Sequence, residues 1–182
     1  MNIIFLDVDG VLNSTTKLIE IYNKTNKPHS LYSYPFDEKC LSNLQSLVKQ
    51  TNSKLVITST WRKTTEGITK LINTLSKYKL DKEIIGITPI LNKKREIEIK
   101  TFLSNLNYNP NFVILDDNCD MGSLLPFLIK TNIKTGLTKE NVEEAILKLN
   151  KNQKLIFCQY FFNIWNYFQR KKIYIIITIN LI

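Results

Sequence analysis

Residues 1–14 read MNIIFLDVDGVLNS, and this stretch decides the fold. An unbroken apolar run ends at Leu6 and is followed by two aspartates, Asp7 and Asp9, and by Gly10. Alternate side chains of an extended strand point the same way, so the two carboxylates can converge on one point. Such a pair is tolerated when Mg²⁺ lies between its members, or when one member is protonated and serves as an acid. The stretch indicates either a functional site or an ordinary turn after a strand. The rest of the sequence distinguishes between these two interpretations.

The chain alternates short apolar runs with segments of helical periodicity. The runs are typical of strands buried on both faces of a parallel sheet, and they cover Ile3–Leu6, Leu55–Ile57, Ile84–Ile87, Phe112–Leu115 and Leu128–Ile129. Apolar residues at helical spacing lie between them, over residues 37–52 behind an Asp37 cap, 65–78, 97–106 and 142–149. This alternation predicts an α/β fold, a Rossmann-like three-layer sandwich with a mostly parallel central sheet.

Three of the predicted strands end in polar sequence. In an open parallel sheet the loops at the carboxyl ends of the strands build the site, and these ends read DVDG, STWR and DDNCD. The second end offers the hydroxyls of Thr58, Ser59 and Thr60, which either cradle a phosphate or cap the next helix. The third places Asp116 and Asp117 directly after an apolar run, where adjacent carboxylates are costly without a cation.

A group of cations precedes the third predicted helix. Lys93, Lys94 and Arg95 open the segment NKKREIEIKTFL. A cation here can bind a phosphate and offset the carboxylates, or the three residues form a solvated helix start. The chain contains no G-x-x-x-x-G-K-[ST] sequence, and no G-x-G-x-x-G follows the first strand. Those absences exclude a P-loop NTPase and argue against a dinucleotide oxidoreductase.

These motifs carry a family resemblance. FLDVDGVLN, VITSTWR, the basic residues before REIEIKTFL, and VILDDNCD resemble the four ordered motifs of the haloacid dehalogenase (HAD) superfamily of Mg²⁺-dependent phosphohydrolases. The chain is most similar to the small domains of the branch associated with RNA-repair proteins, through the W-R pair and the T-G-L-T at residues 135–138. The resemblance covers residues 2 to about 150 and implies a HAD-like domain with a minimal cap or none.

The resemblance also implies roles for the acidic residues. Asp7 would be the nucleophile that forms an aspartyl-phosphate, and Asp9 would protonate the leaving oxygen and later activate water. Mg²⁺ would bind the carboxylates of Asp7 and Asp116 and the backbone carbonyl of Asp9, with Asp117 or Asp120 helping directly or through water.

Two of the implied roles each have two neighbouring residues as candidates. Ser59 would donate to the phosphoryl oxygens, with Thr58 as the alternative, because strand alternation leaves the register uncertain by one residue. Arg95 aligns with the phosphate-binding cation of the branch, and Lys94 competes with it. Arg95 would bring a bidentate fork and Lys94 a flexible point charge.

The implied function is Mg²⁺-dependent hydrolysis of phosphomonoesters, on nucleic-acid ends of RNA or DNA. The intervals after the first and second strands are too short for a sizeable cap, and an uncovered site accepts bulky substrates. The net charge of +9 favours a polyanionic partner, or it reflects a composition rich in Lys, Asn and Ile. The alternatives are a phosphatase of nucleotides or small molecules and a phosphate-binding module without turnover.

The composition changes near residue 150. We predict a phosphatase domain over residues 1–150 and a basic, aromatic- and isoleucine-rich extension over 151–182, which holds five basic and no acidic residues. Helical spacing in the extension predicts a broad apolar face that packs on the domain, pairs with a second subunit or lies on a membrane surface, or the extension is an accretion with little function. Its apolar runs are too short for a transmembrane span. No secretory signal is visible, so we expect a cytoplasmic protein.

Overall fold

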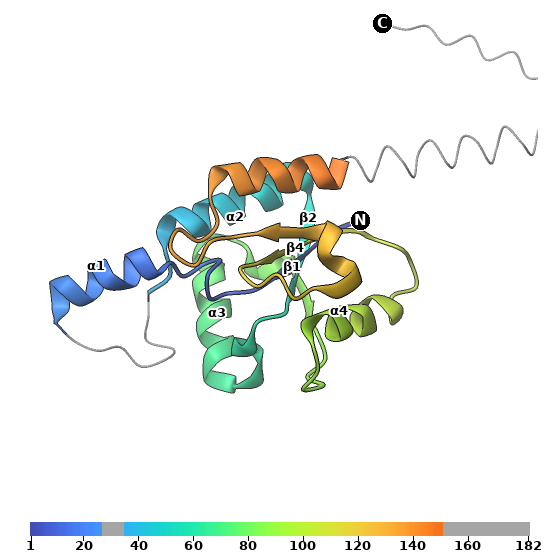
Figure 1. Ribbon diagram of the computed structural model, residues 1–182, viewed down its shortest axis with the longest axis horizontal. Coiled ribbons are helices and arrows are strands. Elements are labelled where there is room, and N and C mark those ends of the chain that lie inside the picture. The colour runs from blue at the N-terminus through green and yellow to red at the C-terminus, as the bar shows by residue number, and fades with distance from the viewer. Residues whose placement is uncertain (27–34, 151–182) are drawn as a thin grey trace, which may run out of the picture. The chain divides into compact units, whose positions relative to one another are not determined.

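A computed structural model describes residues 1–26 and 35–150. One sheet of five parallel strands forms its centre, in the spatial order β3-β2-β1-β4-β5 (Figure 1). The strands are β1 (Asn2–Leu6), β2 (Ser53–Ile57), β3 (Ile84–Ile87), β4 (Asn111–Asp116) and β5 (Leu128–Lys130). Each predicted apolar run lies in one of them, which confirms the α/β fold, and the sheet is parallel throughout.

Helices cover both faces of the sheet. They are α1 (Thr15–Thr25), α2 (Glu38–Thr51), α3 (Thr65–Lys77), α4 (Arg95–Ser104), a helix over residues 139–150 and the short 3₁₀ helices η1 (Thr60–Lys63), η2 (Asp81–Glu83) and η3 (Gly122–Phe127). The predicted cap of α2 is confirmed, because the carboxylate of Asp37 accepts a hydrogen bond from the N–H of Lys39 at 2.9 Å. The helix α1 was not predicted. None of its residues is buried, although Leu18, Ile21 and Tyr22 recur at helical spacing.

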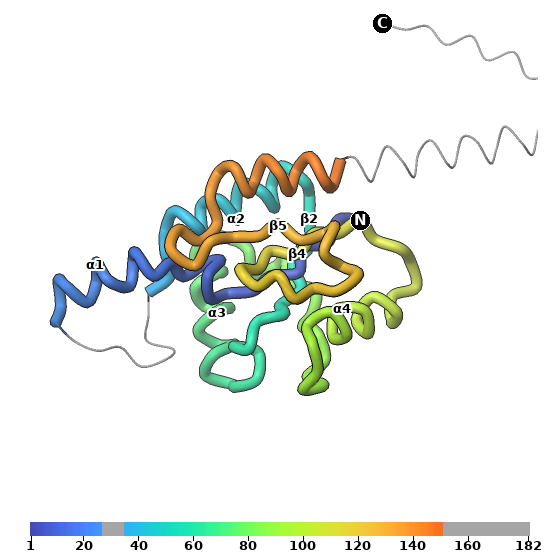
Figure 2. Tube along the Cα trace, viewed as in Figure 1, coloured from blue at the N-terminus to red at the C-terminus, as the bar shows by residue number. Residues whose placement is uncertain are grey.

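The two faces of the sheet pack against different helices. Ile4 and Leu6 of β1 belong to a core with α2, α3 and the helix over residues 139–150, whereas Ile3 and Phe5 pack with α4 and η3. Figure 1 shows α2 and the last helix on one side of the sheet and α4 on the other, and Figure 2 follows the same path as a tube. By strand alternation, Asp7 follows Ile3 and Phe5 and projects from the face that α4 covers.

The order of the strands creates a switch point between β1 and β4. The chain passes from β1 through α2 to β2 and through α3 to β3, and then returns past β1 to form β4. Ligands of open α/β sheets bind outside the carboxyl ends of the strands at such a point. The chain reaches it at Asp7 and again at Asp116.

One compact unit spans Met1–Leu149. Within its described residues, the interval from β1 to α2 holds α1, and the interval from β2 to β3 holds η1, α3 and η2, so neither contains a cap domain. No helix of the described part is long and apolar enough to cross a membrane. The predictions for residues 151–182 lie outside the described residues, and the cytoplasmic location stays a prediction.

Candidate active site

Three polar residues lie level with one another across the ends of three strands. The N–H of Thr58 donates to the carbonyl of Leu6 at 2.9 Å, and the N–H of Asp7 donates to the carbonyl of Leu115 at 3.0 Å. Since Leu6 pairs with Ile57 and with Leu115, these bonds continue the register by one residue. Thr58, Asp7 and Asp116 therefore form one row, and level residues on parallel strands project from the same face.

A cluster of three carboxylates lies at this row. Carboxylate oxygens of Asp7, Asp116 and Asp117 lie within 4.8 Å of one another, and the first two residues are buried. Gly10 makes room for the third: its φ is +73°, and a Cβ there would lie 2.6 Å from the carboxylate of Asp117. Burial, reinforced by the charge of Asp7, raises the pKa of Asp116 to about 6. The same two causes raise the pKa of Asp117.

The first residue of α4 brings one cation to the cluster. Nη1 of Arg95 lies 3.1 Å from Oδ1 of Asp7 and also donates to the carboxylate of Asp116. Burial lowers the pKa of Arg95, but the two carboxylates outweigh it and leave the pKa above its ordinary value. Three carboxylates thus face one guanidinium.

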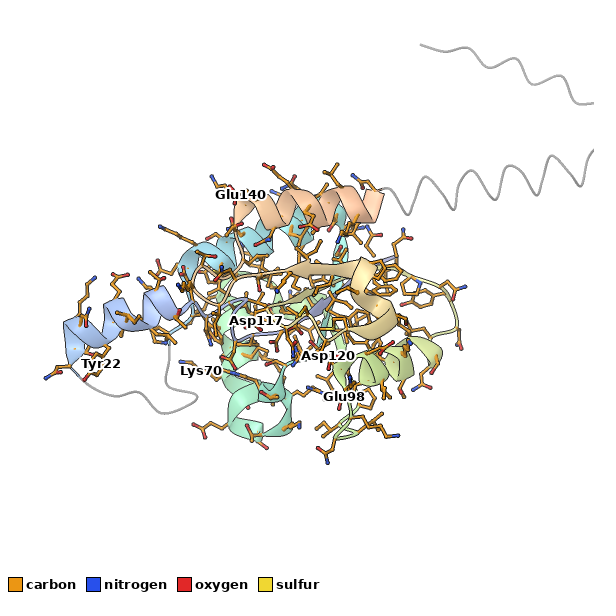
Figure 3. All side chains as sticks on the ribbon, viewed as in Figure 1. Tyr22, Lys70, Glu98, Asp117, Asp120 and Glu140 are labelled. Atoms are coloured by element: carbon orange, nitrogen blue, oxygen red, sulfur yellow. The ribbon has the colours of Figure 1, made fainter. Side chains whose placement is uncertain are left out.

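The neighbouring cation points elsewhere. Nζ of Lys94 binds the carboxylate of Asp120 at 3.1 Å, and both side chains are exposed. Asp120, which Figure 3 labels together with Asp117 in the loop after β4, is therefore paired outside the cluster. Of the two candidate cations, Arg95 contacts the carboxylates.

A comparison with protein families matches this arrangement. Residues 3–142 match the family model described as the HAD domain in Swiss Army Knife RNA repair proteins. The chain belongs to this family. The match covers the predicted motifs from Asp7 to Asp117 and confirms the resemblance read from them. Neither the curated proteins nor the solved structures that were searched gave a match.

In this HAD domain, Asp9 lies apart from the carboxylate cluster. Its side chain is exposed, its Oδ2 accepts a hydrogen bond from Nε1 of Trp61 at 2.9 Å, and its Oδ1 accepts one from Nδ2 of Asn13 at 3.0 Å. The predicted convergence of Asp7 and Asp9 on one point is not seen, because the backbone turns at Val8 and no longer follows strand alternation. The N–H groups of Val11, Leu12 and Asn13 all donate to the carbonyl of Val8.

The two hydroxyl candidates of the domain differ in their partners. Oγ of Ser59 accepts a bond of 3.4 Å from the N–H of Trp61 and so caps η1. Oγ1 of Thr58 is buried and has no hydrogen-bond partner among the described residues. Of these two hydroxyls, that of Thr58 belongs to the residue in the row with Asp7. The cap of α3 is Thr64, whose Oγ1 accepts from the N–H of Gly67.

Sequence reasoning missed a buried ion pair beside the site. Arg62 and Glu98 bind each other with their side chains almost completely buried. Arg62 also donates to backbone carbonyls of Thr58, Ser59, Thr88 and Pro89. The W-R pair belonged to the family resemblance, but no local signal linked Arg62 to a glutamate 36 positions later.

The carboxylate cluster fits the metal that the family implies. Mg²⁺ prefers carboxylate and other oxygen ligands, and Asp7, Asp116 and Asp117 provide three of them. Arg95 offsets one of the three negative charges. A divalent cation would neutralise the remainder.

Proposed function

We propose that this HAD domain is a Mg²⁺-dependent phosphomonoester hydrolase that forms an aspartyl-phosphate on Asp7 and acts on phosphorylated nucleic-acid ends. The observation that carries the proposal is the convergence of Asp7, Asp116 and Asp117 with Arg95 at the switch point of the sheet. A merely structural cluster would not need three carboxylates around one guanidinium.

The carboxylates of Asp7, Asp116 and Asp117 would hold the metal, together with the backbone carbonyl of Asp9. When bound, Mg²⁺ supplies positive charge that polarises a phosphoryl oxygen and lowers the repulsion between the carboxylates and the phosphate. Arg95 would bind the remaining phosphoryl oxygens, as a guanidinium fork suits them. We place the hydroxyl of Thr58 in the donor role first assigned to Ser59, because it is buried, is level with Asp7 and has no hydrogen-bond partner in residues 1–26 and 35–150.

The residues of the chain account for both halves of the reaction. An oxygen of Asp7 attacks phosphorus while the bond from phosphorus to the leaving oxygen breaks, and that oxygen takes a proton from Asp9. Asp9, now a carboxylate, accepts a proton from water. The water oxygen attacks phosphorus, and the bond to Asp7 breaks. Phosphate leaves, and Asp7 and Asp9 return to their starting forms.

Three observations support a macromolecular substrate. The described residues contain no cap domain. The chain carries a net charge of +9, and exposed Lys93 and Lys94 lie next to Arg95. The family takes its name from RNA repair proteins. A phosphatase of nucleotides or small molecules is the second candidate, because the same chemistry serves any accessible phosphomonoester.

The test is Mg²⁺-dependent phosphate release from three substrates: an oligonucleotide with a 3′-phosphate, one with a 5′-phosphate, and 4-nitrophenyl phosphate. Asp7→Asn is the matched control, since it keeps the shape of the side chain and removes the nucleophile. We expect release from one oligonucleotide end to exceed release from the aryl phosphate, with Asp7→Asn at background. Release from the aryl phosphate alone would favour the small-molecule phosphatase. No release from any substrate would leave a phosphate-binding module.

A further inference from the structure

We propose that Trp61 is the positioning residue of Asp9: its indole N–H fixes the carboxylate that delivers a proton to the leaving oxygen. This inference rests on the proposed function and assigns a task to the tryptophan of the W-R pair, to which the sequence analysis gave no role. The contact is 2.9 Å from Nε1 of Trp61 to Oδ2 of Asp9, and it joins two loops that lie 52 positions apart in the chain.

The indole is a rigid donor. Trp61 is 1% exposed, packs within the core beside α2 and α3, and has its ring centroid 5.2 Å from that of Phe36. Its backbone lies in η1, where the next residue, Arg62, donates to the carbonyls of Thr58 and Ser59. The donor therefore keeps one position, whereas the exposed carboxylate of Asp9 depends on its partners for orientation.

Both oxygens of Asp9 are held, by different donors. Oδ2 takes the indole N–H, and Oδ1 takes the amide N–H of Asn13 at 3.0 Å. Two bonds fix the plane of the carboxylate, and each oxygen keeps a lone pair for a proton. Since Asp9 transfers a proton twice in each turnover, a fixed plane keeps it in reach of both the leaving oxygen and the incoming water.

The chemistry of indole suits this task. Its N–H is a donor only and accepts no proton, so Trp61 orients Asp9 without competing for the proton that Asp9 carries. A hydroxyl or an amide in the same place would also offer an acceptor. At Oδ2, the proton of Asp9 therefore meets no competing acceptor in its hydrogen-bond partner.

The test compares two aryl phosphates that differ in how much their leaving groups need a proton. The phenolate of 4-nitrophenyl phosphate leaves without one, whereas phenyl phosphate depends on the acid. For Trp61→Phe we expect kcat/KM for phenyl phosphate to fall by about tenfold or more, and kcat/KM for 4-nitrophenyl phosphate to change by less than about threefold. A packing defect alone would lower both values by the same factor, and Phe36→Leu, which alters the packing of Trp61 but keeps its N–H, serves as that control.

A second variant guards against a folding defect in Trp61→Phe. Replacement of tryptophan by 3-benzothienylalanine, in a Trp165→Phe background, keeps the shape of the ring system and exchanges the N–H for sulfur. It should reproduce the selective loss on phenyl phosphate. Asp9→Asn completes a double-mutant cycle. In the Asp9→Asn background, where residue 9 cannot act as an acid, Trp61→Phe should change kcat/KM for phenyl phosphate by less than about twofold.

The outcomes separate this inference from the function on which it rests. A wild-type protein without turnover on any phosphomonoester would remove the proposed function and this role together. An active wild type in which the benzothienyl variant loses the same factor on both aryl phosphates would overturn the role of Trp61 alone. So would an undiminished effect of Trp61→Phe in the Asp9→Asn background.

Discussion

Arg62 and Arg95 lie on neighbouring elements and both bind buried carboxylates, but their surroundings differ. Arg62 is paired with Glu98, its side chain is 1% exposed, and its other N–H groups bind backbone carbonyls. Arg95 is 20% exposed and faces Asp7 and Asp116, with Asp117 close by. One carboxylate balances the positive charge of Arg62, whereas three carboxylates surround the single positive charge of Arg95.

The difference shows how a structural pair supports a functional one. Arg95 and Glu98 are three positions apart on α4, so they lie on the same side of one helical turn (Figure 3 labels Glu98). Because Arg62 binds Glu98 and the carbonyls at the end of β2, it ties that turn to the strand that carries Thr58. The balanced pair therefore holds Arg95 in place, and the excess carboxylate charge of the unbalanced cluster supports the proposed cation and phosphate site.

Removal of Arg62 should produce the largest loss of stability. Arg62→Met leaves Glu98 buried without its partner, and we expect the free energy of unfolding to fall by about 3–5 kcal/mol. Urea unfolding measures the loss. Arg62→Met combined with Glu98→Gln should lose less than the two single variants together, because the second change removes the stranded charge. A loss below about 1 kcal/mol in Arg62→Met would mean that the pair does not hold the helix.

Removal of Arg95 should instead affect turnover. We expect Arg95→Met to lower kcat/KM for 4-nitrophenyl phosphate by about 10²- to 10³-fold, because the transferring phosphoryl group loses a charged donor. Arg95→Lys keeps the charge but loses the guanidinium fork, so its kcat/KM should lie between the values of the wild type and Arg95→Met. Mg²⁺ should raise the free energy of unfolding of Arg95→Met more than that of the wild type, since it neutralises the carboxylates that Arg95 no longer offsets. Turnover above one tenth of the wild type would contradict the role of Arg95.

The unbalanced cluster also predicts how stability depends on pH. The folded state raises the pKa of Asp116 to about 6, first through burial and then through Asp7, so the folded protein holds this proton more tightly than the unfolded chain. The resulting stability is fully present below the ordinary pKa of an aspartate and is lost as the pH rises through about 6. Without metal, the free energy of unfolding should fall by about 2–3 kcal/mol between pH 4 and pH 7.

Asp116→Asn is the matched control for that pH dependence, because the amide does not titrate. Its unfolding curves should show a smaller fall over the same range. Mg²⁺ needs ionised ligands, so it should stabilise the wild type more at pH 7.5 than at pH 5. Equal stabilisation by Mg²⁺ at both values would show that Asp116 is not among the ligands.

The sequence predicted those parts of the molecule whose signal is local. Strands buried on both faces leave continuous apolar runs, and Asp7 and Asp116 follow two of them directly. The helix α1 was not predicted, although Leu18, Ile21 and Tyr22 recur at helical spacing in its sequence, and it buries none of its residues. The family motifs then supplied the order of the site residues along the chain.

The remaining features of the site depend on contacts that no local pattern encodes. Register favours Thr58 over Ser59 for the proposed phosphate contact, since Thr58 lies level with Asp7 and one residue along the strand reverses the face. The bonds from Trp61 to Asp9 and from Arg62 to Glu98 join positions 52 and 36 residues apart. Such pairs become visible only when the fold brings their loops together.

Geometry also distinguishes Arg95 from Lys94. Of the substitutions considered, replacement of Lys94 has the smallest expected effect. Lys94 pairs with Asp120 on the surface, and exposed ion pairs contribute about 0–1 kcal/mol. Lys94→Met should therefore change the free energy of unfolding by less than about 1 kcal/mol and kcat/KM for 4-nitrophenyl phosphate by less than about threefold. A larger loss on an oligonucleotide substrate, reduced by added salt, would place Lys94 along the path of the nucleic acid backbone. A loss on the aryl phosphate as large as that of Arg95→Met would instead make Lys94 a second phosphate-binding cation. The contrast between the exposed Lys94 and the half-buried Arg95 would then no longer support the choice of Arg95.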